Sequence, residues 1–200
     1  FAADNQGGGY IAALDAETGT VAWRVARGNM SSYSSPVVAN VGGRDQLLIS
    51  GCDAVSSYDP QTGSQLWQTR CVAEATCGTI VTTDKLIFAS GGYPEQETVG
   101  LTADGKILWS NDNKAYEPSM LVAGENLVAI NDGGIAFCWS CQPGRSKCKT
   151  RLGGNVSASP VLVDDKIYVS NLSGDTFVLR AGDQYEQIAR NRLGDDCYAS

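Results

Sequence analysis

Residues 14–23 read LDAETGTVAW, and this stretch decides the fold because the chain repeats it. A second copy, YDPQTGSQLW, occupies residues 58–67, and a shorter copy, TADGKILW, occupies residues 102–109. Each copy places a glycine four residues before a tryptophan, and successive tryptophans are 44 and 42 residues apart. A fixed period of this length indicates a repeat protein in which one supersecondary unit recurs.

A second recurring phrase supports the same period. It consists of small residues followed by an apolar run, and its copies are SSPVV at 34–38, CGTIV at 77–81, PSMLV at 118–122 and ASPVL at 158–162. The third positions of these copies are 43, 41 and 40 residues apart. Two independent phrases therefore keep one repeat length of about 40 residues.

The residues between these phrases predict strands. Each unit contains four short apolar stretches rich in Val, Ile, Leu and Tyr, and Gly or Asp separates them. Such stretches are typical of antiparallel strands joined by tight turns. Four strands in a unit of this length predict an all-β fold, a β-propeller of four-stranded antiparallel blades. Trp23, Trp67 and Trp109 fall on the last strand of their blades, where we expect the indole to cover the joint with the next blade.

The repeat limits predict one propeller fragment over residues 1–200. We expect a partial blade at 1–25, blades at about 33–70, 77–111, 117–152 and 156–191, and the start of another blade at 198–200. The sequence enters the first repeat at its second strand and stops at the opening of another. We therefore expect an incomplete ring whose parent has seven or eight blades.

Composition excludes several classes of function. The net charge is −7, and nucleic-acid binding requires clustered Lys and Arg. No apolar run approaches the length of a membrane span. The chain contains no histidine, which removes the usual general base and every Ser-His-Asp or Cys-His system. We therefore predict no catalytic residues and no enzyme activity.

Seven cysteines leave two interpretations open. Cys141 and Cys148 flank the Pro143-Gly144 turn, and Cys148 stands where other repeats carry Trp. They are either small buried side chains or a disulfide across the hairpin. With Cys138 they form a C-x2-C-x6-C string, but a structural zinc site needs a fourth ligand and no histidine can supply it. We predict no metal site.

If the propeller binds a ligand, the loops that enter each first strand form the channel mouth. Three tyrosines, one acid and two small polar residues give this rim a mixed apolar and hydrogen-bonding character. The predicted rim residues are Tyr33, Thr76, Tyr116, Glu117, Asn155 and Tyr198. The alternative is that they only pack against adjacent blades.

The repeats resemble those of the PQQ-like, or quinoprotein-type, β-propeller family. The resemblance is carried by the ALDAETG and SSPVV phrases and by LISGCDAVSSYD at 48–59, FASGGYP at 88–94, YEPSMLV at 116–122 and RAG at 180–182. Among its members the chain is similar to secreted bacterial PQQ-binding-like repeat proteins. The resemblance implies a periplasmic or secreted, non-catalytic scaffold that binds a protein or small ligand, as outer-membrane assembly lipoproteins with similar repeats do.

The rival interpretation is a fragment of a PQQ-dependent quinoprotein alcohol dehydrogenase. In that class the resemblance implies a quinone held against a Trp and a disulfide between adjacent cysteines, with a calcium ion bound by Glu, Asn and Asp. This sequence has no adjacent cysteine pair, and Trp139 follows Cys138 on a predicted third strand. We therefore predict neither PQQ nor calcium as a cofactor of this chain.

Overall fold

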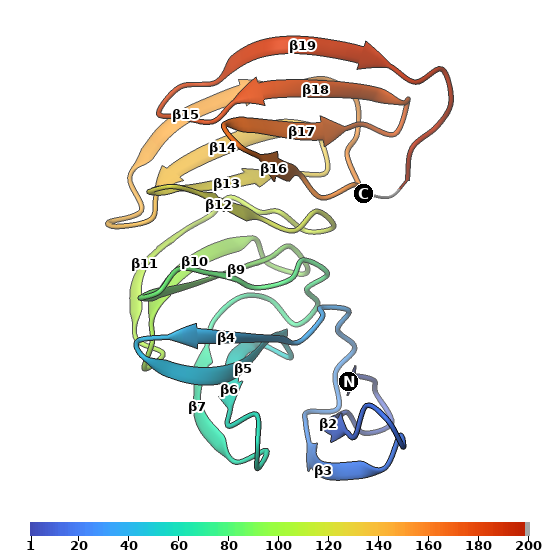
Figure 1. The fold of residues 1–200 in the computed structure, drawn as a ribbon, viewed down its shortest axis with the longest axis vertical. Helices are drawn as coiled ribbons and strands as arrows, with labels where there is room; N and C mark the ends of the chain where they lie inside the picture. Colours follow the sequence, from blue (N-terminus) through green and yellow to red (C-terminus); the bar gives the residue numbers. More distant parts are fainter. Residues whose placement is uncertain (199–200) are drawn as a thin grey trace. The chain divides into compact units, whose positions relative to one another are not determined.

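The computed structural model describes residues 1–198, and all regular structure in them is β-strand (Figure 1). The start of another blade, predicted at 198–200, thus lies almost wholly outside the described residues. The chain divides into two compact units, Phe1–Asn113 and Lys114–Ser200.

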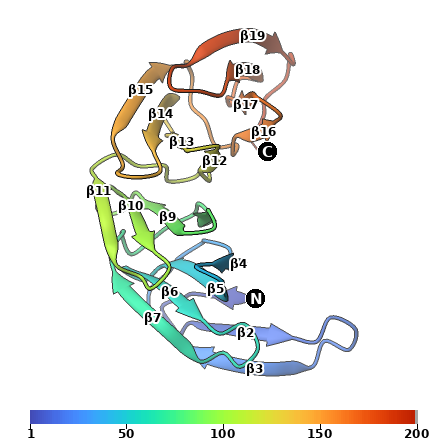
Figure 2. The ribbon, with the colours of Figure 1, turned by 60° about the vertical axis from the view of Figure 1, so that its left-hand side comes forward.

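The first unit contains three antiparallel sheets, each with its strands in chain order (Figure 2). The first sheet consists of β1 (Ala2–Ala3), β2 (Tyr10–Leu14) and β3 (Val21–Ala26). The second consists of β4 (Val37–Val41), β5 (Arg44–Gly51), β6 (Ala54–Tyr58) and β7 (Gln65–Arg70). The third consists of β8 (Val81–Thr82), β9 (Leu86–Gly91), β10 (Glu97–Thr102) and β11 (Ile107–Asn111).

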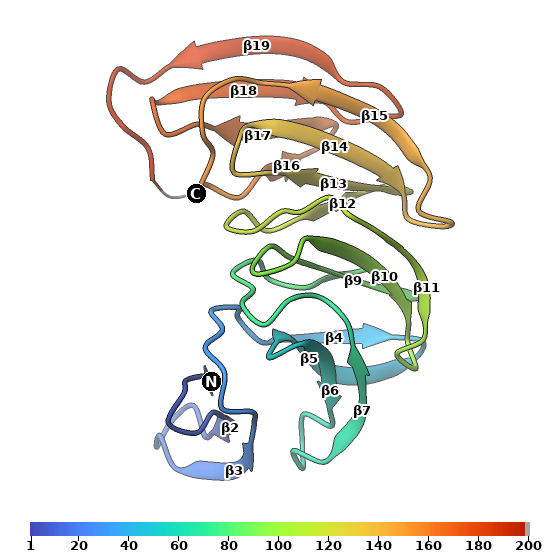
Figure 3. The ribbon, with the colours of Figure 1, turned by 180° about the vertical axis from the view of Figure 1, so that it is seen from behind.

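The second unit contains two four-stranded antiparallel sheets (Figure 3). One consists of β12 (Leu121–Ala123), β13 (Asn126–Ile130), β14 (Ile135–Ser140) and β15 (Ser146–Arg151). The other consists of β16 (Val161–Val163), β17 (Lys166–Ser170), β18 (Asp175–Arg180) and β19 (Glu186–Arg192). Four complete sheets and one partial sheet confirm the predicted all-β fold class. The assignment of all 200 residues to one propeller fragment stays a prediction.

Consecutive sheets of a unit are held together by apolar residues. Leu48 and Val55 of the second sheet share a buried cluster with Ile87 and Val99 of the third. In the second unit, Val128 and Ile130 share a cluster with Ile167 and Phe177. A sheet this small cannot bury both faces by itself, so each gains stability from its neighbour.

The recurrent Asp-x-x-Thr-Gly phrase forms the turn before the last strand. Asp59 Oδ1 accepts hydrogen bonds from the backbone N–H groups of Gln61 and Thr62, at 2.9 and 3.0 Å. Gly63 closes the turn with a φ of 73°, in the region that favours glycine. The residue types thus fix the hairpin in the way the sequence predicts.

One irregularity recurs in every sheet. In each, the register between the last two strands shifts directly after one cross-strand pair. These pairs are Ala13–Trp23, Ser57–Trp67, Gly100–Trp109, Cys138–Cys148 and Val178–Ala189. The second member of each pair occupies what we call the seam position. It carries Trp in three sheets, Cys148 in the fourth and Ala189 in the fifth.

The structure places two of the predicted tryptophans between consecutive sheets. Trp23 Nε1 donates to the carbonyl oxygen of Pro60 at 3.1 Å, and Trp67 Nε1 donates to that of Ala103 at 3.0 Å. Both acceptors belong to the hairpin turn of the following sheet. Trp109 lies near Phe88 of its own sheet, with ring centroids 5.9 Å apart.

No helix long and apolar enough to cross a membrane is found among residues 1–198.

Candidate functional site

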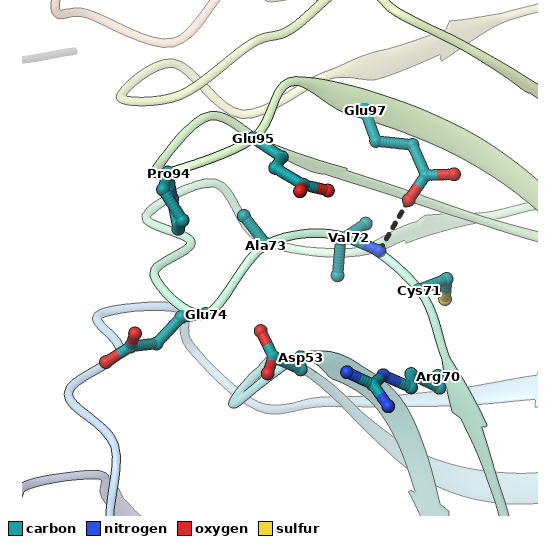
Figure 4. A pocket seen from close by; sticks show the side chains of 9 residues that line it. All are labelled: Asp53, Arg70, Cys71, Val72, Ala73, Glu74, Pro94, Glu95 and Glu97. Carbon is teal, nitrogen blue, oxygen red and sulfur yellow. Dashed lines mark hydrogen bonds between the residues drawn. The ribbon is translucent and has the colours of Figure 1, made fainter.

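An open pocket of about 370 Å³ lies on the first unit (Figure 4). Three chain segments supply its walls: the turn between β5 and β6, the connection that follows β7, and the hairpin between β9 and β10. The lining residues are Asp53, Arg70, Cys71, Val72, Ala73, Glu74, Pro94, Glu95 and Glu97.

Backbone hydrogen bonds hold two of these segments together. Cys52 and Asp53 form the turn after β5 with φ angles of 57° and 59°. The N–H of Cys52 donates to the carbonyl oxygen of Glu74 at 2.8 Å, and the N–H of Cys71 donates to that of Asp53 at 3.2 Å. The pocket wall is therefore tied to the sheet at two points.

Val72 adopts a backbone conformation that is rare for its type. Its φ is 56°, in the left-handed region, which is an outlier for a β-branched residue and costs about 1–3 kcal/mol. Its N–H donates to Glu97 Oε2 at 2.7 Å, and its side chain packs in the buried cluster with Ile80 and Val99. These contacts maintain the conformation and fix the Glu97 carboxylate at the pocket wall.

The pocket is acidic. Its lining contains four acids and one cation, Arg70, which gives a formal excess of three negative charges. The acids are Asp53, Glu74, Glu95 and Glu97. Figure 4 shows Glu95 and Glu97 on one side and Asp53 with Arg70 on the other. Such a lining attracts a cationic group, because each carboxylate can accept charge-assisted hydrogen bonds.

The cysteine in the pocket is not an activated nucleophile. Burial raises the pKa of Cys71 to about 11, and the Glu97 charge adds to the effect. Since the thiolate is the reactive form, Cys71 stays an unreactive thiol near neutral pH. The chemistry that this arrangement supports is recognition of a charged group.

The predicted rim residues of the first unit differ in exposure. Tyr33 is exposed, and its N–H donates to the carbonyl oxygen of Thr76 at 2.9 Å, so the structure brings these two residues together. Thr76 is 0% exposed, and its hydroxyl is hydrogen-bonded to those of Ser32 and Ser50. The Thr76 hydroxyl thus links loops inside the protein, and its role in ligand binding stays a prediction.

In the second unit, Asp132 connects two of the predicted loops. The N–H of Glu117 donates to Asp132 Oδ1 at 3.1 Å, and the N–H of Val156, next to Asn155, donates to the Asp132 carbonyl oxygen. The side chains of Glu117 and Asn155 are exposed. Tyr116 is half-buried beneath the Lys114 ammonium, and Tyr198 is exposed, with its hydroxyl 3.4 Å from Asp196 Oδ2. Their role as a ligand rim stays a prediction.

The cysteines pair differently from the hairpin disulfide suggested by the sequence. Cys148 is a thiol, and the residue opposite it is Cys138 instead of Cys141. Cys141 lies beyond the register shift, in the turn, where its N–H donates to the carbonyl oxygen of Glu125. The register thus favours Cys138 over Cys141 as the partner of Cys148, and a Cys141–Cys148 disulfide stays a prediction.

Two features of the described residues bear on the quinone and calcium site that the quinoprotein resemblance implies. No group of three or more His, Cys, Asp or Glu side chains in residues 1–198 is arranged to hold a metal ion. The ring of Trp139 stacks on Phe137, with centroids 5.4 Å apart and planes at 7°, and Trp139 is 2% exposed. That indole is enclosed by protein and presents no free face to a quinone.

Sequence reasoning missed the pocket carboxylates. Asp53, Glu74 and Glu97 are far apart in the chain and none lies in a functional motif. The only local signal was the turn former Asp53 between two apolar stretches, and it marks a turn without revealing which loops meet there.

Comparisons with known proteins place this fold in a family. A family model described as "Outer membrane protein assembly factor BamB" matches residues 7–187. The crystal structure of BamB from Moraxella catarrhalis superimposes with a TM-score of 0.76 at 17% identity, covering 99% of this chain and 65% of that one. The chain thus spans just under two thirds of that structure, and the likeness shows a β-propeller fold. No curated protein matches the sequence. The chain belongs to the PQQ-like β-propeller repeat family of the outer membrane assembly factor type.

Proposed function

We propose that this chain is part of a non-catalytic propeller that binds a protein partner through its loops. The observation that carries the proposal is the match of residues 7–187 to a family described as an outer membrane protein assembly factor. A frame of sheets with hydrogen-bonded loops suits such a role, because loops can vary in sequence without disturbing the packed strands.

The acidic pocket of the first unit is the contact point that we propose. It suits a Lys or Arg side chain of the partner, since the carboxylates of Asp53, Glu95 and Glu97 lie around the opening. Tyr93, which directly precedes Pro94 at the pocket edge, is 65% exposed. An exposed aromatic ring beside a cation-binding pocket adds contact area and a cation–π partner.

The proposal extends to location and cofactors. Family membership supports a periplasmic or secreted protein of the cell envelope. The net charge of −7 disfavours nucleic acid as the partner. We propose that the chain works without PQQ or calcium, because its residues do not match that site.

The test uses fluorescent peptides that differ only in a central Arg, Lys, Gln or Glu, with fluorescence anisotropy as the readout. We expect the Arg and Lys peptides to bind more tightly than the Gln and Glu peptides. In the double variant Asp53→Asn/Glu95→Gln, binding weakens by about three- to tenfold, as loss of two partly exposed ion pairs implies. The matched control Glu17→Gln/Asp45→Asn removes the same charge at exposed positions outside the pocket and should leave binding unchanged.

Equal binding of all four peptides, or equal weakening in the control, would show that the pocket is not the contact point. A parallel incubation with PQQ and calcium tests the quinoprotein alternative. Cofactor absorbance that travels with the protein at equal stoichiometry would overturn the non-catalytic proposal.

A further inference from the structure

Cys138 on β14 and Cys148 on β15 are cross-strand partners in one sheet of the second unit. Side chains of such partners project from the same face of a sheet. Their Cα atoms are about 4.5–5.5 Å apart in antiparallel sheets, and disulfides span Cα separations of about 4.4–6.8 Å. The pairing therefore places the two Cα atoms within the range that a disulfide spans.

The register shift brings these two cysteines together. Cys138 pairs with Cys148, whereas the next residue, Trp139, pairs with Ser146, so Lys147 is the extra residue of the bulge. The Lys147 ammonium is held by Asp183 at 2.6 Å and by Asn126 at 2.7 Å. The bulge is anchored by these contacts, which keeps Cys148 opposite Cys138.

The two thiols differ in access. Cys138 is 0% exposed, and its Sγ donates to the carbonyl oxygen of Gly182 at 3.6 Å. Cys148 is only half-buried, so a reagent in solution can reach it. Burial raises the pKa of both thiols, that of Cys138 to about 12. For Cys148 the rise is partly offset, because a hydrogen bond with Cys138 lowers the pKa of Cys148. Cys148 is therefore the thiol that ionises first.

We propose that Cys138 and Cys148 form a cross-strand disulfide when the chain meets a disulfide oxidant such as oxidised glutathione. The inference is independent of the proposed binding function. It rests on the register of β14 and β15 and on the difference in access between the two thiols.

The reaction balances as two thiol–disulfide exchanges. The Cys148 thiolate attacks one sulfur of oxidised glutathione, breaks its S–S bond and releases one glutathione thiolate. Cys138 then loses its proton and attacks the Cys148 sulfur of the mixed disulfide, which releases the second glutathione. The protein loses two electrons and two protons, and the oxidant gains them as two glutathione thiols.

The disulfide would stabilise the contact between two consecutive sheets, which other sheets make through a tryptophan at the seam position. Cys148 occupies the seam position at which Trp23 and Trp67 reach carbonyl groups in the following hairpin. A cysteine is too short for that reach, but its partner Cys138 already contacts Gly182 in the hairpin between β18 and β19. The disulfide would place a rigid link beside this contact.

The experiment treats the reduced whole chain with oxidised glutathione at about pH 8, where a useful fraction of thiolate forms. We expect the unreduced peptide that carries this pair to be lighter by about 2 Da, since two hydrogens leave. Peptide mapping without reduction should show a Cys138–Cys148 link. In Cys138→Ala, exchange should stop at a stable mixed disulfide on Cys148, whereas the control Cys141→Ala should form the link as the unsubstituted chain does.

Mapping of the unsubstituted chain keeps the test decisive even if Cys138→Ala folds poorly. A link between Cys141 and Cys148 would overturn the proposal, and so would a Cys148 that remains fully open to alkylation after oxidation. Loss of the link in Cys141→Ala would also contradict it, because Cys141 has no part in the reaction.

Discussion

Trp67 is joined to Ala103 by a hydrogen bond that connects two sheets: its Nε1 donates to the Ala103 carbonyl oxygen at 3.0 Å. The same Nε1 lies 2.9 Å from Gln46 Oε1, and Gln46 Nε2 also donates to the Ala103 carbonyl. The indole packs against Gly105 in the same turn, where a Cβ would approach the ring to 2.5 Å. The Trp67 side chain thus joins the second and third sheets by apolar contact and by a hydrogen bond.

The first prediction concerns the contribution of Trp67 to the contact between these two sheets. Trp67→Ala should lower the free energy of unfolding by about 3 kcal/mol, the lower end for buried aromatic truncations, because the ring is half-buried. Trp67→Phe keeps most of the apolar contact and loses the hydrogen bond, so it should lose about 1 kcal/mol. Urea denaturation followed by circular dichroism measures both. A loss under about 1 kcal/mol for Trp67→Ala would mean that the ring does not stabilise the joint.

The second prediction concerns the buried ion pair of Asp4 and Arg27. Arg27 Nε and Nη2 donate to the two carboxylate oxygens of Asp4 at 2.7 and 3.0 Å, and both side chains are 3% exposed. Asp4→Asn leaves the guanidinium buried without its counter-charge and should cost about 3–5 kcal/mol.

The double variant Asp4→Leu/Arg27→Met removes both charges and should recover most of that loss, because no charge then stays buried. Chemical denaturation of the parent chain, the single variant and the double variant gives the comparison. If the double variant is as unstable as Asp4→Asn, the unpaired charge is not the cause.

The third prediction concerns acid stability. Asp175 accepts hydrogen bonds from Arg190 at 2.7 Å and Arg192 at 3.1 Å, and these bonds lower its pKa to about 2. A carboxylate whose folded pKa is below its unfolded value of about 3.9 stabilises the fold above that value. This contribution is lost as the pH falls from about 4 to about 2.

Asp175→Asn should therefore lose less of its thermal stability over that interval than the parent chain does. Thermal midpoints at about pH 7, 4 and 2 provide the measurement. Asp164→Asn, an exposed acid in the same unit, is the matched control and should behave as the parent. An unchanged acid slope in Asp175→Asn would contradict the assignment.

The fourth prediction follows from the proposed disulfide. The bond would close a loop of eleven residues from Cys138 to Cys148, and loops of that length gain about 2–3 kcal/mol in the chain-entropy description. The oxidised chain should unfold at higher urea concentration than the reduced chain. Cys148→Ala, treated in the same way, should show no such increase. An oxidised chain with a mapped link but lower stability would mean that the link strains the sheet.

The fold could be predicted because its signals are local and repeated. The Asp-x-x-Thr-Gly phrase specifies a turn through Asp59 and Gly63, and strand lengths follow from the apolar stretches between such turns. The position of Trp67 four residues after Gly63 was sufficient to place it on the last strand of its sheet.

The pocket and the cysteine pairing could not be predicted in the same way, because both depend on register. Cys141 and Cys148 flank the turn and suggested each other as partners, yet the bulge at Lys147 sets Cys148 against Cys138. The pocket needs three segments from two sheets and a left-handed Val72, which no propensity of valine predicts.

The shared register shift shows that the backbone of the hairpin does not depend on which residue occupies the seam position. The backbone irregularity is the same whether the seam position carries an indole, a thiol or, at Ala189, a methyl group. The residue that contacts the following sheet can therefore change while the turn of the hairpin stays the same. To stabilise the second unit, an aromatic ring could be introduced at Cys148, which the hairpin between β18 and β19 follows, with the rest of the hairpin sequence unchanged.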